Sequence, residues 1–274
     1  MSYVTRKFVR EGVVLSLRDW GGDGLGVLLL HGLAGHCGEW DGLARSLRRD
    51  GYRVLALDQR GHGASERTPA DVSRRAYVDD ALAVVEEFGG GERAFVLVGQ
   101  SYGGHAALLA AARRHPRIAG AVLVEAGPAG STPEDVAHVA EWLRGLPVPF
   151  ASRGAAVSYF GGGAVGKGWA SGFEERDGGW WPRFDATVLA ASLDENAVRS
   201  WWEEWDAVDV PLLAVLGQHG IIDAEQWDGM ARRQPGLRGV CLPGAGHDAH
   251  LERPEQVYGV VGAFLREAGG GGRV

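Results

Sequence analysis

Short apolar runs alternate with amphipathic segments along most of the chain. Fully apolar runs such as Val27–Leu30 and Phe95–Val98 are typical of strands buried on both faces of a parallel sheet. Between such runs, apolar residues recur three and four positions apart, as Tyr77, Ala81 and Val84 do, which predicts helices with one buried face. Strands that alternate with helices indicate an α/β protein whose mostly parallel sheet is covered on both faces. The predicted strands cover residues 8–9 and 13–17 (a hairpin), 27–30, 53–58, 95–98, 121–125, 212–216 and 239–242, and the predicted helices cover 40–47, 77–88, 105–113, 224–233 and 254–267.

The middle of the chain, residues 127–206, departs from this alternation. Its helix-like segments, residues 133–146 and 198–206, are separated by clusters of glycine. A segment poor in strands that follows one strand and precedes the next is typical of a lid over the carboxyl edge of the sheet. Seven of the ten tryptophans lie here, and we expect most of them to pack the segment together and one or two to line a pocket. These seven are Trp142, Trp169, Trp180, Trp181, Trp201, Trp202 and Trp205.

Composition narrows the possible partners and cofactors. The formal net charge of −7 over 274 residues argues against nucleic acid or an anionic membrane as the main partner. The cysteines Cys37 and Cys241 follow no metal-ligand spacing, and no His-Glu-x-x-His set is present, so we expect no metal and no cofactor. The amino-terminal residues lack the apolar stretch of a signal peptide, and the longest apolar runs are only as long as a strand. We therefore expect a cytoplasmic protein. The glycines at 269–272 predict a flexible tail.

A serine lies within the stretch Phe95-Val-Leu-Val-Gly-Gln-Ser-Tyr-Gly-Gly104. Gly99 and Gly103 flank Ser101 two positions before and after it, in the G-x-S-x-G pattern of a tight strand-to-helix turn that exposes a nucleophilic hydroxyl. Glycine is needed at both positions because a Cβ there would collide with the neighbouring strand or helix. The alternative is a glycine-rich turn that only joins a strand to a helix. The apolar run before the motif and the alanine-rich segment after it favour a nucleophile at Ser101.

Four spaced motifs resemble the α/β-hydrolase superfamily, over nearly the whole length of the chain. The resemblance implies an α/β-hydrolase fold, with an eight-stranded, mostly parallel sheet, helices on both faces and a helical lid inserted after the sixth strand. Residues 1–126 and 207–274 would form the core and residues 127–206 the lid. The motifs are His31-Gly32, Asp58-x-Arg-Gly-His-Gly-x-Ser65, Gly99-x-Ser-x-Gly103 and Gly246-His247-x-x-His250-Leu-Glu-x-Pro254.

The same resemblance implies the roles of individual residues. Ser101 takes the position of the nucleophile, and because a serine hydroxyl is a poor nucleophile it needs a base. His247 takes the position of that base, and His250 is its neighbouring rival. The backbone amides of Leu33 and Tyr102 take the positions that hold the oxyanion.

The acid of the triad departs from the pattern of the superfamily. Its usual turn after the seventh strand reads Gly217-Gln-His-Gly220, with glycine where the aspartate belongs. Asp223 follows in the same loop, and Glu125 ends the sixth strand, where some branches such as certain haloalkane dehalogenases place the acid. Because strand six adjoins the strand of the nucleophile, we prefer Glu125 to Asp223. A serine–histidine pair without an acid is the third alternative.

These residues predict a serine hydrolase that cleaves a small or medium carboxylic ester or lactone through an acyl-enzyme. An aromatic lid would favour an apolar or ring-containing substrate. Trp142, Trp181 and His31 are the candidates for contact with it, although the resemblance also places His31 in a structural turn. We expect a small molecule as the only partner, with neither nucleic acid nor membrane, and a monomer or homodimer.

Three other functions compete with this prediction. Hydrolysis of a carbon–carbon bond next to a ketone would use the same triad. A cofactor-free, dioxygenase-like enzyme is possible on the same fold, although Tyr102 stands where such enzymes tend to carry a histidine. A non-catalytic binding protein would have no need to keep Ser101, His247 and the oxyanion loop together.

Overall fold

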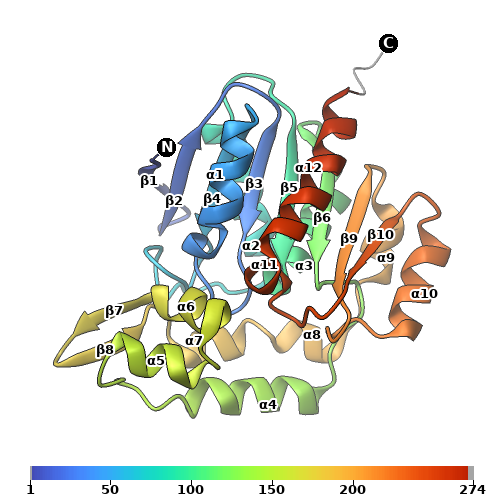
Figure 1. Cartoon of the computed structure of the whole chain (residues 1–274). Helices are drawn as coiled ribbons and strands as arrows, with labels where there is room; N and C mark the ends of the chain where they lie inside the picture. The colour runs from blue at the N-terminus through green and yellow to red at the C-terminus, as the bar shows by residue number, and fades with distance from the viewer. Residues whose placement is uncertain (1, 271–274) are drawn as a thin grey trace.

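One eight-stranded sheet runs through the protein in the computed structural model, which describes residues 2–270 (Figure 1). Its strands are β1 (Val4–Arg10), β2 (Val13–Gly21), β3 (Gly26–Leu30), β4 (Arg53–Asp58), β5 (Phe95–Gln100), β6 (Ile118–Val124), β9 (Leu212–Gly217) and β10 (Arg238–Leu242). Their order across the sheet is β1-β2-β4-β3-β5-β6-β9-β10. The pairs β1–β2 and β2–β4 are antiparallel, and the other neighbours are parallel. The predicted fold class is confirmed.

The apolar strands divide their side chains between two layers of helices. In β3, Leu28 and Leu30 join the cluster that includes Leu108, whereas Val27 and Leu29 join the cluster on the opposite face. A fully apolar strand therefore contributes to both hydrophobic clusters, because successive side chains of a strand point to opposite faces of the sheet. The first cluster contains residues of α2 (Arg74–Phe88) and α3 (Tyr102–Ala112), and the second contains residues of α1 (Asp41–Arg49) and α12 (Pro254–Gly270). The remaining helices of the core are η1 (Cys37–Trp40), α10 (Ala224–Arg233) and α11 (Ala249–Glu252).

Residues 127–206, the insertion, lie between β6 and β9 in the chain and cross the carboxyl ends of the sheet strands (Figure 1). The sequence predicts a helical segment, but the insertion also contains a two-stranded hairpin. Its turn, Asp177-Gly178, has φ angles of 49° and 76°, a left-handed pair that is typical of tight hairpins. The elements are α4 (Pro133–Arg144), α5 (Arg153–Tyr159), α6 (Gly163–Ser171), β7 (Phe173–Arg176), β8 (Gly179–Pro182), α7 (Ala186–Ala191), α8 (Asp194–Val198) and α9 (Trp202–Ala207). The division into core and lid stays a prediction.

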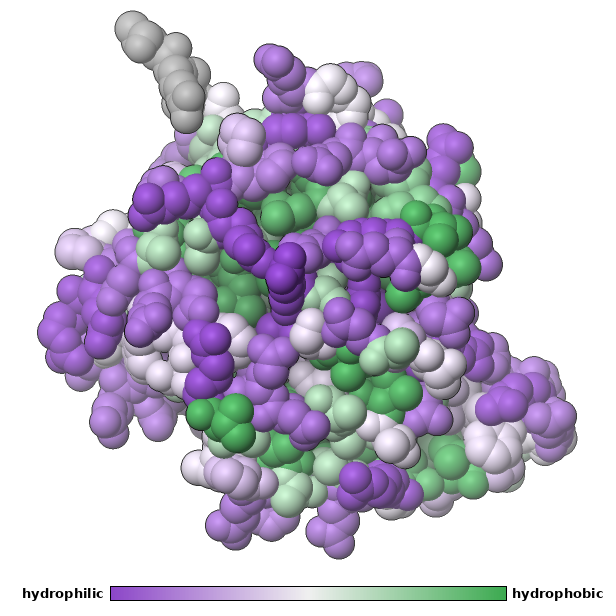
Figure 2. All heavy atoms as spheres, turned by 180° about the vertical axis from the view of Figure 1, so that it is seen from behind, coloured by the Kyte–Doolittle hydropathy of each residue, from purple (hydrophilic) through white to green (hydrophobic). Residues whose placement is uncertain are grey.

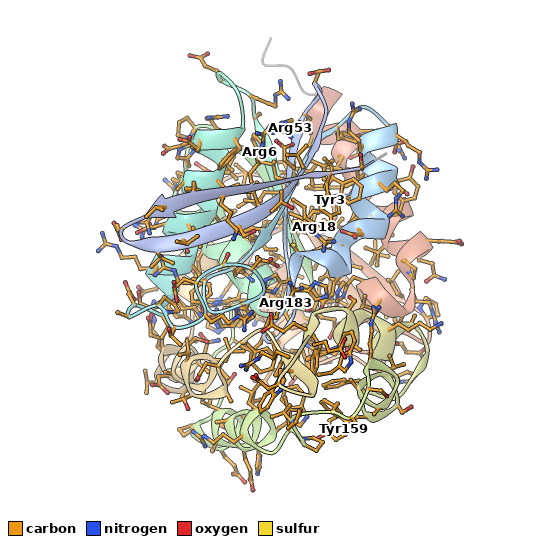
Figure 3. All side chains as sticks on the ribbon, turned by 90° about the vertical axis from the view of Figure 1, so that its left-hand side faces the viewer. Tyr3, Arg6, Arg18, Arg53, Tyr159 and Arg183 are labelled. Carbon is orange, nitrogen blue, oxygen red and sulfur yellow. The ribbon has the colours of Figure 1, made fainter. Side chains whose placement is uncertain are left out.

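Polar contacts join the insertion to the core at Arg183, which Figure 3 labels where the two parts meet. Its carbonyl accepts from the amide of Gly63 in the core (2.8 Å), while its Nε donates to the carbonyl of Gly172 within the insertion (2.7 Å). Arg67 binds both carboxylate oxygens of Glu174, each at 2.7 Å. Such bidentate pairs fix direction as well as distance, so the hairpin is held against the loop that follows β4.

The amino-terminal strand is longer than the predicted hairpin, since β1 begins at Val4 rather than at residue 8. Most of β1 is exposed and its sequence does not alternate between polar and apolar residues, which leaves no pattern to detect. At the carboxyl end, α12 continues to Gly270, and the rest of the predicted glycine tail lies outside the described residues. Figure 3 shows Arg6 of β1 and Arg53 of β4 near each other, and both form ion pairs with Asp19 of β2.

The face opposite to that of Figure 1 is mainly hydrophilic, with hydrophobic side chains showing between the polar ones (Figure 2). Among residues 2–270, none of the helices combines the length and the apolar character that crossing a membrane requires.

Candidate active site

Ser101 lies in a strained turn between β5 and α3. Its φ and ψ of 50° and −115° fall in a region that residues with a side chain rarely adopt. The turn is held by the amide of Ser101, which donates to the carbonyl of Val124 (2.8 Å). A Cβ on Gly99 would lie 2.2 Å from the carbonyl oxygen of Gly103, and one on Gly103 would lie 2.4 Å from that of His31. Both glycines are therefore required by close approach of backbone.

The loop after β3 brings Leu33 to the same cavity as Ser101 and Tyr102. The backbone amides of Leu33 and Tyr102 donate to no other group among residues 2–270, so both remain available to a ligand. His31 is fully buried behind this loop. Its Nε2 accepts from the amide of Gln59 (3.0 Å), and its Nδ1 lies 2.7 Å from the carbonyl of Gly32. Burial lowers the pKa of His31 to about 3, so the ring stays neutral and shapes the loop.

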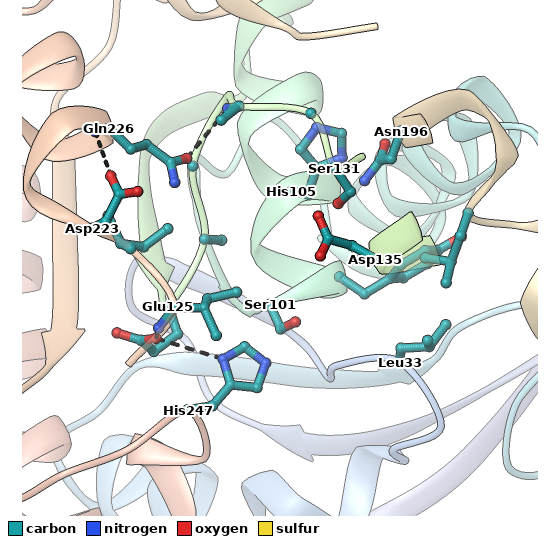
Figure 4. Close-up of a pocket in the computed structure, with 18 of the residues that line it drawn as sticks. Leu33, Ser101, His105, Glu125, Ser131, Asp135, Asn196, Asp223, Gln226 and His247 are labelled. Carbon is teal, nitrogen blue, oxygen red and sulfur yellow. Dashed lines mark hydrogen bonds and ion pairs between the residues drawn. The ribbon is translucent and has the colours of Figure 1, made fainter. Parts of the chain in front are cut away.

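His247 and Glu125 face each other at the carboxyl edge of the sheet (Figure 4). The Nδ1 of His247 lies 3.5 Å from Oε2 of Glu125. Glu125 is 0% exposed, and its two oxygens accept from the amides of Gly217 and Ile221, each at 2.6 Å. These donors fix the carboxylate and stabilise its charge. The imidazole itself is 37% exposed and lines the cavity of Ser101.

Gly220, in the loop after β9, leaves room for the carboxylate of Glu125. A Cβ at this position would lie 2.1 Å from Oε2 of Glu125. The glycine in the loop after β9 and the glutamate after β6 are therefore complementary, because the carboxylate fills the space that a side chain at position 220 would need.

Asp223 and His250, the two rivals, are engaged elsewhere. Asp223 lines the cavity, but its carboxylate caps α10 by accepting from the amide of Gln226 (2.8 Å; Figure 4). The buried ring of His250 lies against Trp40, and its Nε2 is 3.3 Å from Oε2 of Glu39. Of these candidates, the structure brings Ser101, His247 and Glu125 together.

The cavity above Ser101 has a volume of about 1030 Å³. Three tryptophans of the insertion line it, Trp142, Trp169 and Trp202, and the first two meet edge to face at 5.6 Å. Trp181 lies in the β7–β8 hairpin with the guanidinium of Arg176 over its ring, outside the cavity lining. His31 does not line the cavity either, so neither Trp181 nor His31 is placed to contact a molecule in it.

Sequence reasoning missed several polar residues of the cavity. Gln100 precedes Ser101, and its Nε2 donates to the carbonyl of His247 (2.9 Å), which ties the two loops together. His105 lies one helical turn after Ser101, and a histidine in an otherwise apolar helix was a detectable signal. Arg74 and Asn196 also line the cavity, but their local sequence gave no signal. Arg74 belongs to an arginine pair at the start of a helix, and Asn196 lies in a charged segment, and both settings are typical of exposed surfaces.

Comparisons with known proteins identify the family of the chain. A family model described as the alpha/beta hydrolase family matches residues 27–260. The sn-1-specific diacylglycerol lipase ABHD11 of Mus musculus is 26% identical over 253 residues, which cover 87% of this chain and 80% of that protein. Esterase YbfF of Escherichia coli is 26% identical over 256 residues, which cover 88% and 93%.

The fold is shared with a solved enzyme. The crystal structure of E-2-(acetamidomethylene)succinate hydrolase superimposes with a TM-score of 0.87 at 23% identity, over 96% of this chain and 99% of that one. The matched family model covers most of the chain, and the sheet, the strained serine turn and the motifs predicted from the sequence agree with it. The chain is therefore an enzyme of the α/β-hydrolase family.

Proposed function

We propose that the protein is a serine hydrolase of carboxylic esters or lactones. The observation that carries the proposal is the alignment of Glu125 with His247, 3.5 Å apart, in the cavity that the strained Ser101 lines. A nucleophile, a base and a group that orients the base are the parts that acyl transfer needs. The lipase and the esterase among its relatives both act on esters, which supports the choice of bond.

In the first half of the reaction, Oγ of Ser101 attacks the carbonyl carbon while its proton passes to Nε2 of His247. The amides of Leu33 and Tyr102 donate to the oxyanion that forms. Nδ1–H of His247 donates a hydrogen bond to the carboxylate of Glu125, which remains ionised and stabilises the imidazolium. The bond to the alcohol oxygen then breaks, and that oxygen takes the proton from His247, which leaves an ester on Ser101.

In the second half, water attacks the acyl-enzyme while His247 takes one of its protons. The tetrahedral intermediate collapses, the proton returns to Oγ of Ser101, and the carboxylic acid is released. The partial exposure of His247 gives water access to this base. In a lactone the alcohol oxygen belongs to the same molecule, so the product is a hydroxy acid.

A fluorophosphonate probe tests the nucleophile directly. We expect folded wild-type protein to be labelled covalently at Ser101 and the Ser101→Ala variant to remain unlabelled. Ser131→Ala is the matched control, because Ser131 also lines the cavity but has no place in the reaction, and it should be labelled like the wild type. Absence of labelling in folded wild type would reject the serine hydrolase.

The insertion also contacts the loop of the proposed base. Nε1 of Trp169 donates to Oδ2 of Asp248, the neighbour of His247, at 3.2 Å. Trp169→Phe removes this bond but keeps an aromatic ring, so kcat/KM for an ester should fall about fivefold, the equivalent of one hydrogen bond of about 1 kcal/mol. Trp142→Phe is the control, since the indole of Trp142 donates to no group among residues 2–270. Equal losses in the two variants would show that ring size, and not the bond to Asp248, matters.

A further inference from the structure

Arg74 is a buried cation at one end of the cavity. Arg74 is 2% exposed, and the Cζ of its guanidinium lies 3.7 Å from the centre of the Tyr102 ring. Nε donates to Oδ1 of Asn196 (3.3 Å), whereas the buried Nη1 has no hydrogen-bond partner. Among residues 2–270, no carboxylate forms an ion pair with this guanidinium. A buried charge without a counter-charge is costly, so a ligand that supplies one would be favoured.

His105 lines the same end of the cavity and is also unsatisfied. It is 5% exposed, and neither of its ring nitrogens has a hydrogen-bond partner. Burial, together with the positive charge of Arg74, lowers the pKa of His105 well below its usual value. The ring is therefore neutral and can donate one N–H. Both residues line the cavity, and both carry buried nitrogens without a hydrogen-bond partner, which indicates a missing hydrogen-bonding group.

Two carboxylates of this region, those of Glu195 and Asp135, are already engaged. Oε1 of Glu195 accepts from the backbone amide of Arg74 (2.9 Å) rather than from its guanidinium. Asp135 lines the cavity at an exposed position, and its Oδ2 accepts from the amide and the hydroxyl of Thr132 in the cap of α4. Neither compensates Arg74 directly.

The unsatisfied groups lie close to the proposed reaction centre. His105 follows Ser101 by four residues in α3, about 6 Å along the helix axis. Arg74 covers the ring of Tyr102, whose amide is a proposed oxyanion donor. In the view of Figure 4, His105 and Asn196 lie on the side of Ser101 away from His247. A molecule attached to Ser101 could therefore extend its acyl part toward them, with its alcohol part near His247.

We propose that Arg74 and His105, with Asn196 as the support of the guanidinium, bind a carboxylate at the far end of the acyl part of the substrate. This inference rests on the proposed function and gives it a substrate class, the half-esters of dicarboxylic acids and lactones that carry a free carboxylate. Arg74 supplies charge and donors, neutral His105 supplies one N–H, and Asn196 holds the guanidinium in place. Hydrolysis then releases a dicarboxylate, or a hydroxy dicarboxylate from a lactone.

The wild-type enzyme gives the first test. Monoethyl succinate, glutarate and adipate are each compared with the ester in which a carboxamide of the same shape replaces the free carboxylate, by pH-stat titration of released acid. For the chain length that fits, kcat/KM should favour the carboxylate by roughly 10- to 150-fold, as expected for hydrogen bonds to a charged group. A carboxamide hydrolysed as fast as its carboxylate at every length would overturn the inference.

Two variants assign that preference to Arg74. Arg74→Met keeps an unbranched, apolar stem but removes the charged guanidinium, and the ratio of the two kcat/KM values should fall toward one. Arg232→Met is the matched control, because Arg232 is an exposed arginine elsewhere on the cavity wall, and its ratio should equal that of the wild type. A folded Arg74→Met enzyme with an unchanged ratio would contradict the assignment.

Binding to Ser101→Ala separates this inference from the proposed function and needs no folded Arg74 variant. Calorimetric titration with monoethyl glutarate, succinate and adipate should show at least one of them binding at least tenfold tighter than its carboxamide analogue. Such binding without any hydrolysis by the wild type would reject the serine hydrolase and leave the carboxylate site standing. Ester hydrolysis by the wild type without such binding would reject the carboxylate site and leave the serine hydrolase standing.

Discussion

In a Glu125→Gln enzyme, kcat for ester hydrolysis should fall by about 10⁴, the loss expected when the acid of a triad becomes an amide. Glu125 now accepts from two backbone amides and faces Nδ1 of His247. A neutral amide of the same shape cannot stabilise the imidazolium, and it can present an N–H to Nδ1, which would favour the wrong tautomer. The measurement is steady-state kinetics on one ester, with thermal unfolding to verify that the variant is folded.

Asp223→Asn is the matched control for that substitution. Its carboxylate caps α10, and asparagine caps helices about equally well, so both kcat and stability should change little. If Asp223→Asn lost as much activity as Glu125→Gln, the acid would be misassigned. Small and equal losses in both variants would indicate a serine–histidine pair that works without an acid.

A methyl group at position 220 should disable the enzyme although no proposed catalytic residue is replaced. The Cβ of Gly220→Ala would lie 2.1 Å from Oε2 of Glu125, so the carboxylate must move away from its present place. The backbone of Gly220 has no positive φ, so alanine fits it locally. Because a displacement of about 1 Å at a catalytic group can cost about 100-fold, kcat should fall by about 10².

Two comparisons show whether that loss acts through Glu125. In the Glu125→Gln background, Gly220→Ala should cost far less than in the wild type, since residues in contact have non-additive effects. Gly236→Ala is the control, because a Cβ there meets nothing within 4 Å. A full 100-fold loss in both backgrounds would mean that the methyl group disturbs something other than the carboxylate.

Much of the fold follows from local pattern. The strand over 53–58 and the helix over 224–233 begin and end where the sequence predicts them, because apolar runs and helical periodicity coincide with burial there. The hairpin β7–β8 was missed although Asp177-Gly178 is a strong turn signal. Tryptophan-rich segments of this kind are ambiguous, since indoles pack in helices and strands alike.

The three candidate substrate contacts show the limit of such reasoning. Trp142 lines the cavity, whereas Trp181 and His31 do not, and nothing in their local sequence distinguishes the two tryptophans. Which face of a short element meets a cavity depends on how the insertion packs on the core. Arg74 is a stronger example, because one of two adjacent arginines is buried beside Tyr102 while its neighbour Arg75 is exposed.

By itself, the sequence determined the class of fold, the serine turn and the identity of His247 as the candidate base. These depend on short motifs whose geometry is local, such as glycines that allow close approach of backbone around Ser101. Only the tertiary structure decided which carboxylate faces His247. Glu125 and Gly220 are 95 positions apart, and each has its meaning only because β6 and β9 are neighbours in the sheet. The tertiary structure also decided that the charge of Arg74 is unpaired among residues 2–270. Burial and the absence of a counter-charge arise only when several segments pack together, so the local sequence around Arg74 does not reveal them.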